Sequence, residues 1–188
     1  MRKSRLVVLV ALLGLVIFAP SRAFATDDND ESQTYTLLMP VPNEARSADG
    51  DMVMLQGTAM LSVHPKSFNG SGSFVLTNDG ATVTGTWHGT GELLAFQPYG
   101  CGVLRGNPLP NPFACGGFSQ EPIVLVPTAG PQMEGILRVI CIIGDVPGQY
   151  FVSKNATEGV TLNVPGFENY NQPEEGMNVY IFTGGEPG

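Results

Sequence analysis

One long stretch of the chain alternates apolar and polar residues with a period of two. From Met52 to His64, every second residue is apolar or small, and the residues between them are polar or methionine. A period of two places alternate side chains on opposite faces of a β-strand. We therefore expect a half-buried strand here. Its expected inward face is Val53, Leu55, Gly57, Ala59, Leu61 and Val63.

Three shorter alternating segments follow, separated by turn residues. Gly72–Asn78 ends at the hairpin signal Asn78-Asp79-Gly80. Ala81–His88 comes next and ends at Gly89-Thr90-Gly91, and the last segment is Glu92–Gln97. The pattern predicts a meander of four antiparallel strands between residues 52 and 97.

Other apolar segments bounded by Gly, Pro or Asn lie on both sides of the meander. The expected strands are Tyr35–Met39 (ended by Pro40 and Pro42), Ile123–Val126, Glu134–Ile143, Gln149–Ser153, Gly159–Val164 and Asn178–Thr183. The chain between Tyr99 and Glu121 is rich in Gly and Pro and is expected to be a long loop excursion. About eight to ten short strands favour an all-β fold over residues 34–188. A single antiparallel β-sandwich and a partly closed β-barrel produce the same alternation, so both remain open.

The first 25 residues have the layout of a cleavable signal peptide. A basic start precedes the apolar run Leu6–Phe18, and Ala23-Phe24-Ala25 presents small residues at the positions that a signal peptidase reads. A run of 13 residues is shorter than the roughly 20 that a membrane-spanning helix needs. We expect cleavage after Ala25, a disordered acidic tether over residues 26–33, and a secreted or periplasmic protein without stable membrane insertion.

The net charge of the mature chain limits the classes of partner that it can bind. The leader carries four basic residues and no acid, so the mature chain keeps five basic and 17 acidic residues, a formal charge of −12. Such a surface repels phosphate backbones, and nucleic-acid binding is therefore disfavoured.

All three cysteines lie in the exported part of the chain, where a disulfide can persist. Cys101 and Cys115 enclose a short loop that holds three prolines, and each is followed by Gly, so we favour this pair. Cys141 lies in an apolar segment and is expected to be a buried free thiol. Pairings of Cys141 with either of the other two cysteines remain open.

No sequence motif identifies a catalytic site. The two histidines, His64 and His88, fall on the expected solvent side of their strands, and the Gly-x-Ser-x-Gly nucleophile motif is absent from the sequence. Isolated acids such as Glu92, Glu121 and Glu134 do not reveal a catalytic pair. We expect a protein that is not an enzyme, with a carboxylate-based hydrolase as an alternative.

Two acidic turns could supply oxygen ligands to a metal. Asp49-Gly50-Asp51 and Asn78-Asp79-Gly80 contain the residue types that calcium prefers, but neither follows the ligand order of an EF-hand. Turn residues of this kind need no ion. We therefore expect no cofactor and no metal site, and calcium is the cation that these turns would suit best.

Aromatic residues in the expected loops are the remaining candidates for a function. Aromatic rings among amide side chains on a β-scaffold suit the binding of a protein or a carbohydrate. The candidate ligand-binding residues are Tyr99, Phe113, Phe118, Phe167 and Tyr170. The leading hypothesis is an exported, non-enzymatic binding or interaction module. A carrier of a small apolar ligand, with a barrel cavity behind Val53–Val63 and Leu137–Ile143, is an alternative.

Overall fold

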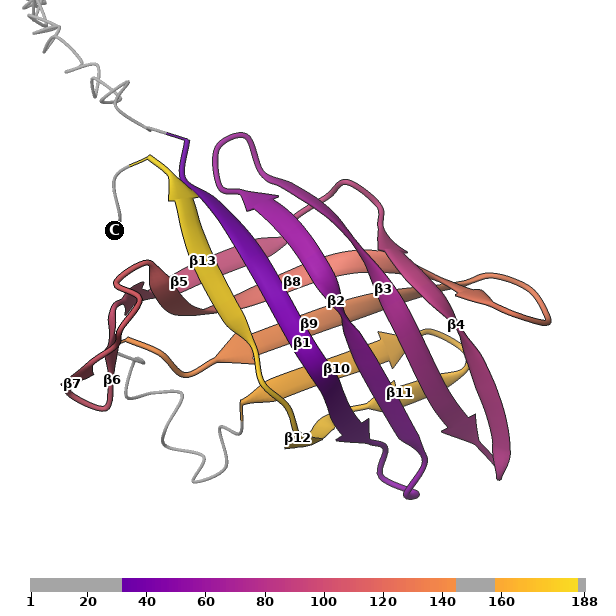
Figure 1. Ribbon diagram of the computed structural model, residues 1–188. Coiled ribbons are helices and arrows are strands. Elements are labelled where there is room, and N and C mark those ends of the chain that lie inside the picture. The colour runs from indigo at the N-terminus through magenta and orange to yellow at the C-terminus, as the bar shows by residue number, and fades with distance from the viewer. Residues whose placement is uncertain (1–31, 145–157, 186–188) are drawn as a thin grey trace, which may run out of the picture.

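A computed structural model describes residues 32–144 and 158–185 (Figure 1). The expected signal peptide, residues 26–31 of the expected tether and the strand expected at Gln149–Ser153 lie outside the described residues. The strands are β1 (Thr34–Arg46), β2 (Met52–Ser62), β3 (Ser67–Asn78), β4 (Ala81–Gly89), β5 (Ala95–Cys101), β6 (Val103–Leu104), β7 (Asn107–Pro108), β8 (Ala114–Pro127), β9 (Met133–Cys141), β10 (Gly159–Val164), β11 (Glu168–Tyr170), β12 (Gln172–Glu175) and β13 (Val179–Gly184). None of the described residues forms a helix that could cross a membrane. The all-β prediction is confirmed.

The central sheet is antiparallel and follows the order β11-β10-β9-β8-β13-β1-β2-β3-β4. β4 also pairs with β8, from Gly85–Pro127 to Gly89–Ile123, so the strands β8, β13, β1, β2, β3 and β4 form a partial ring. The long strand β8 makes this possible because it pairs with β4, β5, β9 and β13 along its length.

The prediction of the meander is confirmed for β2, β3 and β4 but is wrong for its fourth strand. β5 pairs with β8 instead of β4. The free edge of β4 is already occupied by the second half of β8, and the link to β5 follows the edge of β8 through hydrogen bonds from Thr90 N to Pro122 O (3.2 Å) and from Leu94 N to Gln120 O (2.9 Å). Ring closure thus decides the partner of β5.

β1 is longer than predicted. Pro40 and Pro42 were expected to end it, yet the strand continues to Arg46. The pairing of β1 with β2 shifts register between Met39 and Asn43, so the prolines lie where the ladder requires no backbone donor from them.

Two layers of strands enclose the core. In Figure 1, β13, β1, β2, β3 and β4 cross in front of β5, β8, β9, β10 and β11. The predicted inward residues Val53, Leu55, Ala59 and Leu61 of β2 are buried, and they belong to one apolar cluster with Leu137 and Val139 of β9.

The predicted disulfide between Cys101 and Cys115 is confirmed, and it joins the end of β5 to the start of β8. Closing a loop of this size contributes about 3 kcal/mol in the chain-entropy account. Cys141 is a buried free thiol, as predicted, and burial raises its pKa to about 12. The disulfide indicates an oxidising environment.

Candidate functional site

The five aromatic candidates do not share one environment. Tyr99 and Tyr170 are buried, and Phe118 is partly buried within β8. Phe113 and Phe167 are 55% and 37% exposed. Tyr99, Phe118 and Tyr170 lie in the strands β5, β8 and β11, so the expectation that they belong to loops is wrong. Only the two phenylalanines present much of their rings at the surface.

The two exposed phenylalanines belong to different ends of the molecule. Phe113 lies in the disulfide-closed segment that contains β6 and β7, at the left of Figure 1. Phe167 lies in the turn between β10 and β11, at the right. The structure therefore does not bring the two predicted aromatic loops together.

Phe167 lines an open pocket of about 560 Å³. The pocket lies between β4, the hairpin that joins β8 to β9, and the β10–β11 turn. Its lining is mostly apolar, and Glu134 is its one charged residue among those that the structure describes. The lining residues are Val83, Pro127, Ala129, Pro131, Gln132, Met133, Glu134, Val164, Pro165, Gly166 and Phe167. Three prolines fix the backbone of the walls, which limits the ordering that a ligand would have to impose.

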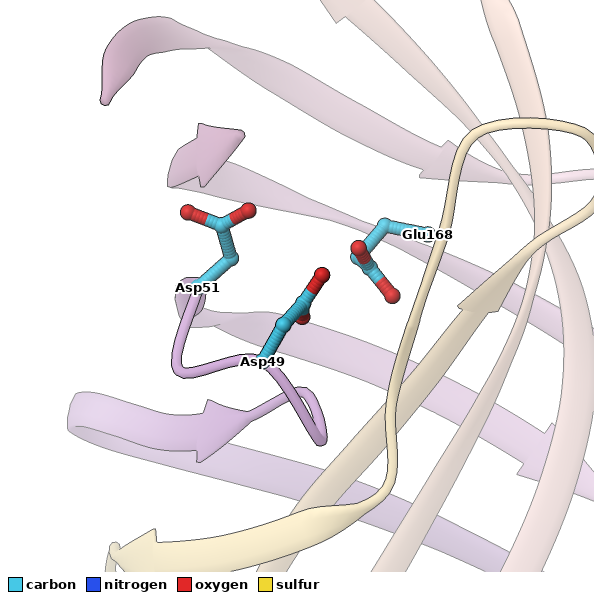
Figure 2. A group of neighbouring side chains, drawn as sticks. All are labelled: Asp49, Asp51 and Glu168. Atoms are coloured by element: carbon cyan, nitrogen blue, oxygen red, sulfur yellow. The ribbon is translucent and has the colours of Figure 1, made fainter. Parts of the chain in front are cut away.

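A cluster of three carboxylates lies beside the same β10–β11 turn. Figure 2 shows Asp49 and Asp51, from the loop between β1 and β2, turned toward Glu168 at the start of β11. One carboxylate oxygen from each of the three lies within 4.8 Å of the others. Asp51 Oδ2 also accepts a hydrogen bond of 3.0 Å from Asp79 N, so the two acidic turns singled out in the sequence are neighbours.

Burial and the charges of the carboxylate cluster both raise the pKa of a tyrosine, Tyr170. Burial raises the pKa of Tyr170 well above its usual value, and the charges of Glu168, Asp51 and Asp49 raise it further. The Tyr170 hydroxyl donates to Thr77 O at 2.9 Å. This hydrogen bond joins β11 to the end of β3 and so positions the β10–β11 turn next to the meander.

The cluster supplies oxygen atoms of the kind that hard cations bind. Acidic side chains also gather at protein surfaces without an ion, and Asp49 is exposed. The expectation of no metal site therefore stays a prediction, and calcium stays the cation that these side chains would suit best. Glu168 was not singled out with the two turns, because it is more than a hundred residues from Asp51 in the sequence and only the pairing of β11 with β10 brings it there.

Both histidines are exposed, as predicted: His64 follows β2, and His88 lies near the end of β4.

Glu121 is the residue whose environment the sequence interpretation missed. It lies on the inner face of β8, is 0% exposed, and neither of its carboxylate oxygens has a hydrogen-bond partner. Burial raises its pKa to about 8, and the nearby Ser119 hydroxyl offsets this only in part. The alternation that buries Ile123 and Leu125 places Glu121 on the same face, and this was the available signal.

The polar surroundings of Glu121 are a small network inside the core. Tyr180 donates to Ser119 Oγ at 2.8 Å, and its hydroxyl also lies 3.3 Å from Val139 O. The negative charge that Glu121 can carry raises the pKa of Tyr180 further, after burial as the main cause. A carboxyl group in this position favours its neutral form.

The pocket around Phe167 and the carboxylate cluster are thus the two surface features that converge on the β10–β11 turn. Their chemistry has to be judged from their own geometry. Comparison of the chain with protein-family models, with curated proteins and with solved structures found no match.

Proposed function

We propose that this chain is an exported binding module without catalytic activity, and that the pocket around Phe167 receives an apolar part of its ligand. The observation that carries the proposal is the pocket itself: an exposed aromatic ring, a methionine and three prolines around about 560 Å³. Pockets of this size and lining bind ligands through apolar contact, and the few polar groups orient them.

Export is supported by the leader-like pattern of residues 1–25 and by the disulfide. Oxidised cysteine pairs persist outside the cytoplasm. A secreted or periplasmic location follows from this proposal, with a partner that is a protein or a carbohydrate bearing an apolar face.

Surface binding is favoured over transport in an interior cavity. The inward faces of β2 and β9, which a carrier would need as cavity walls, pack together with Tyr35, Trp87 and Tyr180 in one apolar cluster. Large aromatic side chains fill the space between the layers, which supports a ligand site at the end of the strands.

Phe167→Ala is expected to weaken binding of the neutral apolar dye N-phenylnaphthylamine about tenfold, because a buried Phe contact contributes roughly 1.5–3 kcal/mol. The increase in dye fluorescence on binding, titrated with protein, measures the affinity. Phe113→Ala is the control, since it removes another exposed phenylalanine ring at the other end of the molecule. Equal losses in both variants, or none in Phe167→Ala, would contradict the proposal.

A carboxylate-based hydrolase is the second candidate, and the convergence of Asp49, Asp51 and Glu168 favours it. Two carboxyl groups can divide the acid and base roles in hydrolysis of a glycosidic bond. If this candidate is right, aryl glycosides are hydrolysed faster than in buffer, and Glu168→Gln lowers that rate about a hundredfold. The hydrolase candidate would be excluded if the unaltered protein hydrolyses aryl glycosides no faster than buffer does. It would also be excluded if the distant variant Glu92→Gln loses as much of the hydrolysis rate as Glu168→Gln.

A further inference from the structure

A second pocket, of about 700 Å³, lies at the outer side of the register shift in β1. Strand β12 and the residues after it form the opposite wall. The residues that decide its chemistry are four glutamates and two methionines: Glu44, Glu158, Glu174, Glu175, Met54 and Met177. None of them lines the pocket around Phe167, so the two pockets are independent.

The glutamates repel one another in their present arrangement. Glu44 and Glu175 are directly opposite each other in the pairing of β1 with β12. Like charges in that position destabilise a sheet. Arg46 pairs with Glu44 at 2.5 Å, and this is the one salt bridge among residues 32–144 and 158–185. Within the described part of the chain, no salt bridge is formed by the other three carboxylates of the pocket.

Glu158 gives the pocket a poorly hydrated carboxylate. Its Oε1 accepts a hydrogen bond of 2.8 Å from Asn178 N. Burial is the main cause that raises its pKa, and this hydrogen bond opposes the rise. A carboxylate taken partly out of water gains more from a neighbouring cation than an exposed one does.

A buried amide points at the wall of the same pocket. Asn43 is 0% exposed, and its Nδ2 donates to Val41 O at 3.1 Å, whereas its Oδ1 has no hydrogen-bond partner. That oxygen is directed at Gly176, a wall residue: a Cβ on Gly176 would lie 1.9 Å from it. Buried polar atoms without a partner are rare in proteins. Asn43 Oδ1 therefore packs against Gly176 beneath the wall and is not itself part of the pocket lining, so the partner of the pocket is decided by the carboxylates and methionines that line it.

We propose that this pocket binds a small alkylamine, with its ammonium group among the carboxylates of Glu158, Glu174 and Glu175 and its alkyl chain against Met54 and Met177. An ammonium group brings the positive charge that the carboxylates of this wall would attract, and its N–H groups can donate to their oxygens. A bare metal ion is a poor fit to about 700 Å³ with two thioether side chains in the wall, since hard cations select small sites made of oxygen ligands. Methionine adapts its shape to flexible alkyl chains.

Titration with hexylamine, followed by NMR of protein labelled with ¹³C at the methionine methyl groups, tests the assignment. The Met54 and Met177 signals are expected to shift and to saturate. Met60, which is exposed farther along β2, and Met39, which is buried, serve as internal references and should not shift. Hexanol, which has the same chain without the charge, should bind at least about tenfold more weakly.

The double variant Glu158→Gln/Glu175→Gln is expected to lose about tenfold in hexylamine affinity. Glu92→Gln/Glu134→Gln, at two exposed positions outside the pocket, is its control for net charge, and Glu92→Gln alone is the control for a single substitution. Glu174→Gln, at an exposed position, should show a smaller loss in the same direction, which preserves the test if the double variant does not fold. The assignment would be overturned if the methionine signals show no saturable shift, if hexanol binds as tightly as hexylamine, or if either control variant loses as much hexylamine affinity as the pocket variant that it matches. It would also be overturned if acetyl-lysine amide binds more tightly than hexylamine, which would assign the pocket to a lysine side chain of a partner protein.

Discussion

The free energy of unfolding is expected to fall as the pH rises from about 4.5 to about 8, because the folded state holds a proton on Glu121 that the unfolded state releases. Glu121 is fully buried, and among the described residues no cation contributes to its pKa. The groups that face it are the Ser119 and Tyr180 hydroxyls, with Tyr99 and Cys141 close enough to influence Tyr180.

The direction of this pH dependence follows from the protonation state of Glu121 in the folded and in the unfolded chain. Below pH 4.5 the carboxyl group is neutral in both states, and its full contribution to stability is present. Between pH 4.5 and about 8, the unfolded chain ionises while the folded chain does not, so each pH unit costs about 1.4 kcal/mol. Above about 8 both states are ionised, and the accumulated loss is on the order of 5 kcal/mol. Burial of Glu158 also raises its pKa, and this effect has the same sign.

Denaturant unfolding of the unaltered protein and of Glu121→Gln at a series of pH values measures this effect. We expect the variant to match the unaltered protein near pH 5, to exceed it near pH 8, and to show a much flatter pH dependence. Glu134→Gln, exposed on the neighbouring strand β9, should keep the original slope. The same slope in Glu121→Gln as in the unaltered protein would show that Glu121 is ionised in the folded state.

Removal of the Trp87 side chain is expected to destabilise the fold by about 3–5 kcal/mol, the usual cost of replacing a buried Trp by Ala. Trp87 is buried, its Nε1 donates to Gln56 O at 3.0 Å, and its ring stacks near Phe68. It is the single tryptophan of the chain, so its own fluorescence reports unfolding of the unaltered protein. For Trp87→Ala, circular dichroism measures the transition instead.

The tryptophan fits only because two strands approach closely beneath it. Gly57 and Gly72 are paired across β2 and β3, and a Cβ on Gly72 would lie 1.9 Å from Gln56 O and 2.5 Å from Trp87 Nε1. Gly72→Ala is therefore expected to cost about 3 kcal/mol or more, because both a backbone carbonyl and the indole ring would have to move.

Gly135→Ala is the matched control for this steric argument. A Cβ there would lie 3.1 Å from the end of the Leu162 side chain, which can give way, and 3.2 Å from Asn163 O, so a shift of a few tenths of an ångström accommodates it. We expect a loss of less than about 1 kcal/mol there, measured by the same denaturant titration. Equal stability of the two alanine variants would show that β2 and β3 are not as close at Trp87 as the structure has them.

Local alternation was sufficient to predict the regularly alternating strands β2, β3 and β4, because the period of two in side-chain direction belongs to each strand by itself. For that reason the buried face of β2 and the exposed histidines could be predicted from the sequence. The disulfide was predictable for a similar reason, since Cys101 and Cys115 are close along the chain. The same alternation continued through β8, where it places Glu121 inside, although a carboxylate there contradicts the usual preference for apolar residues.

Strand partners could not be predicted in this way, because they depend on which edges remain free once the ring has closed. β5 pairs with β8 because β8 already covers β4, and the resulting strands place Tyr99 and Phe118 where loops were expected. The same long-range pairing brings Glu168 to Asp49 and Asp51.

The sequence by itself thus determined the regularly alternating strands, the buried face of β2 and the disulfide, all of which depend on neighbours close along the chain. Only the tertiary structure decided which aromatic rings stay exposed and which carboxylates meet. It also decided where the two pockets form, because these features depend on contacts between segments far apart in the chain.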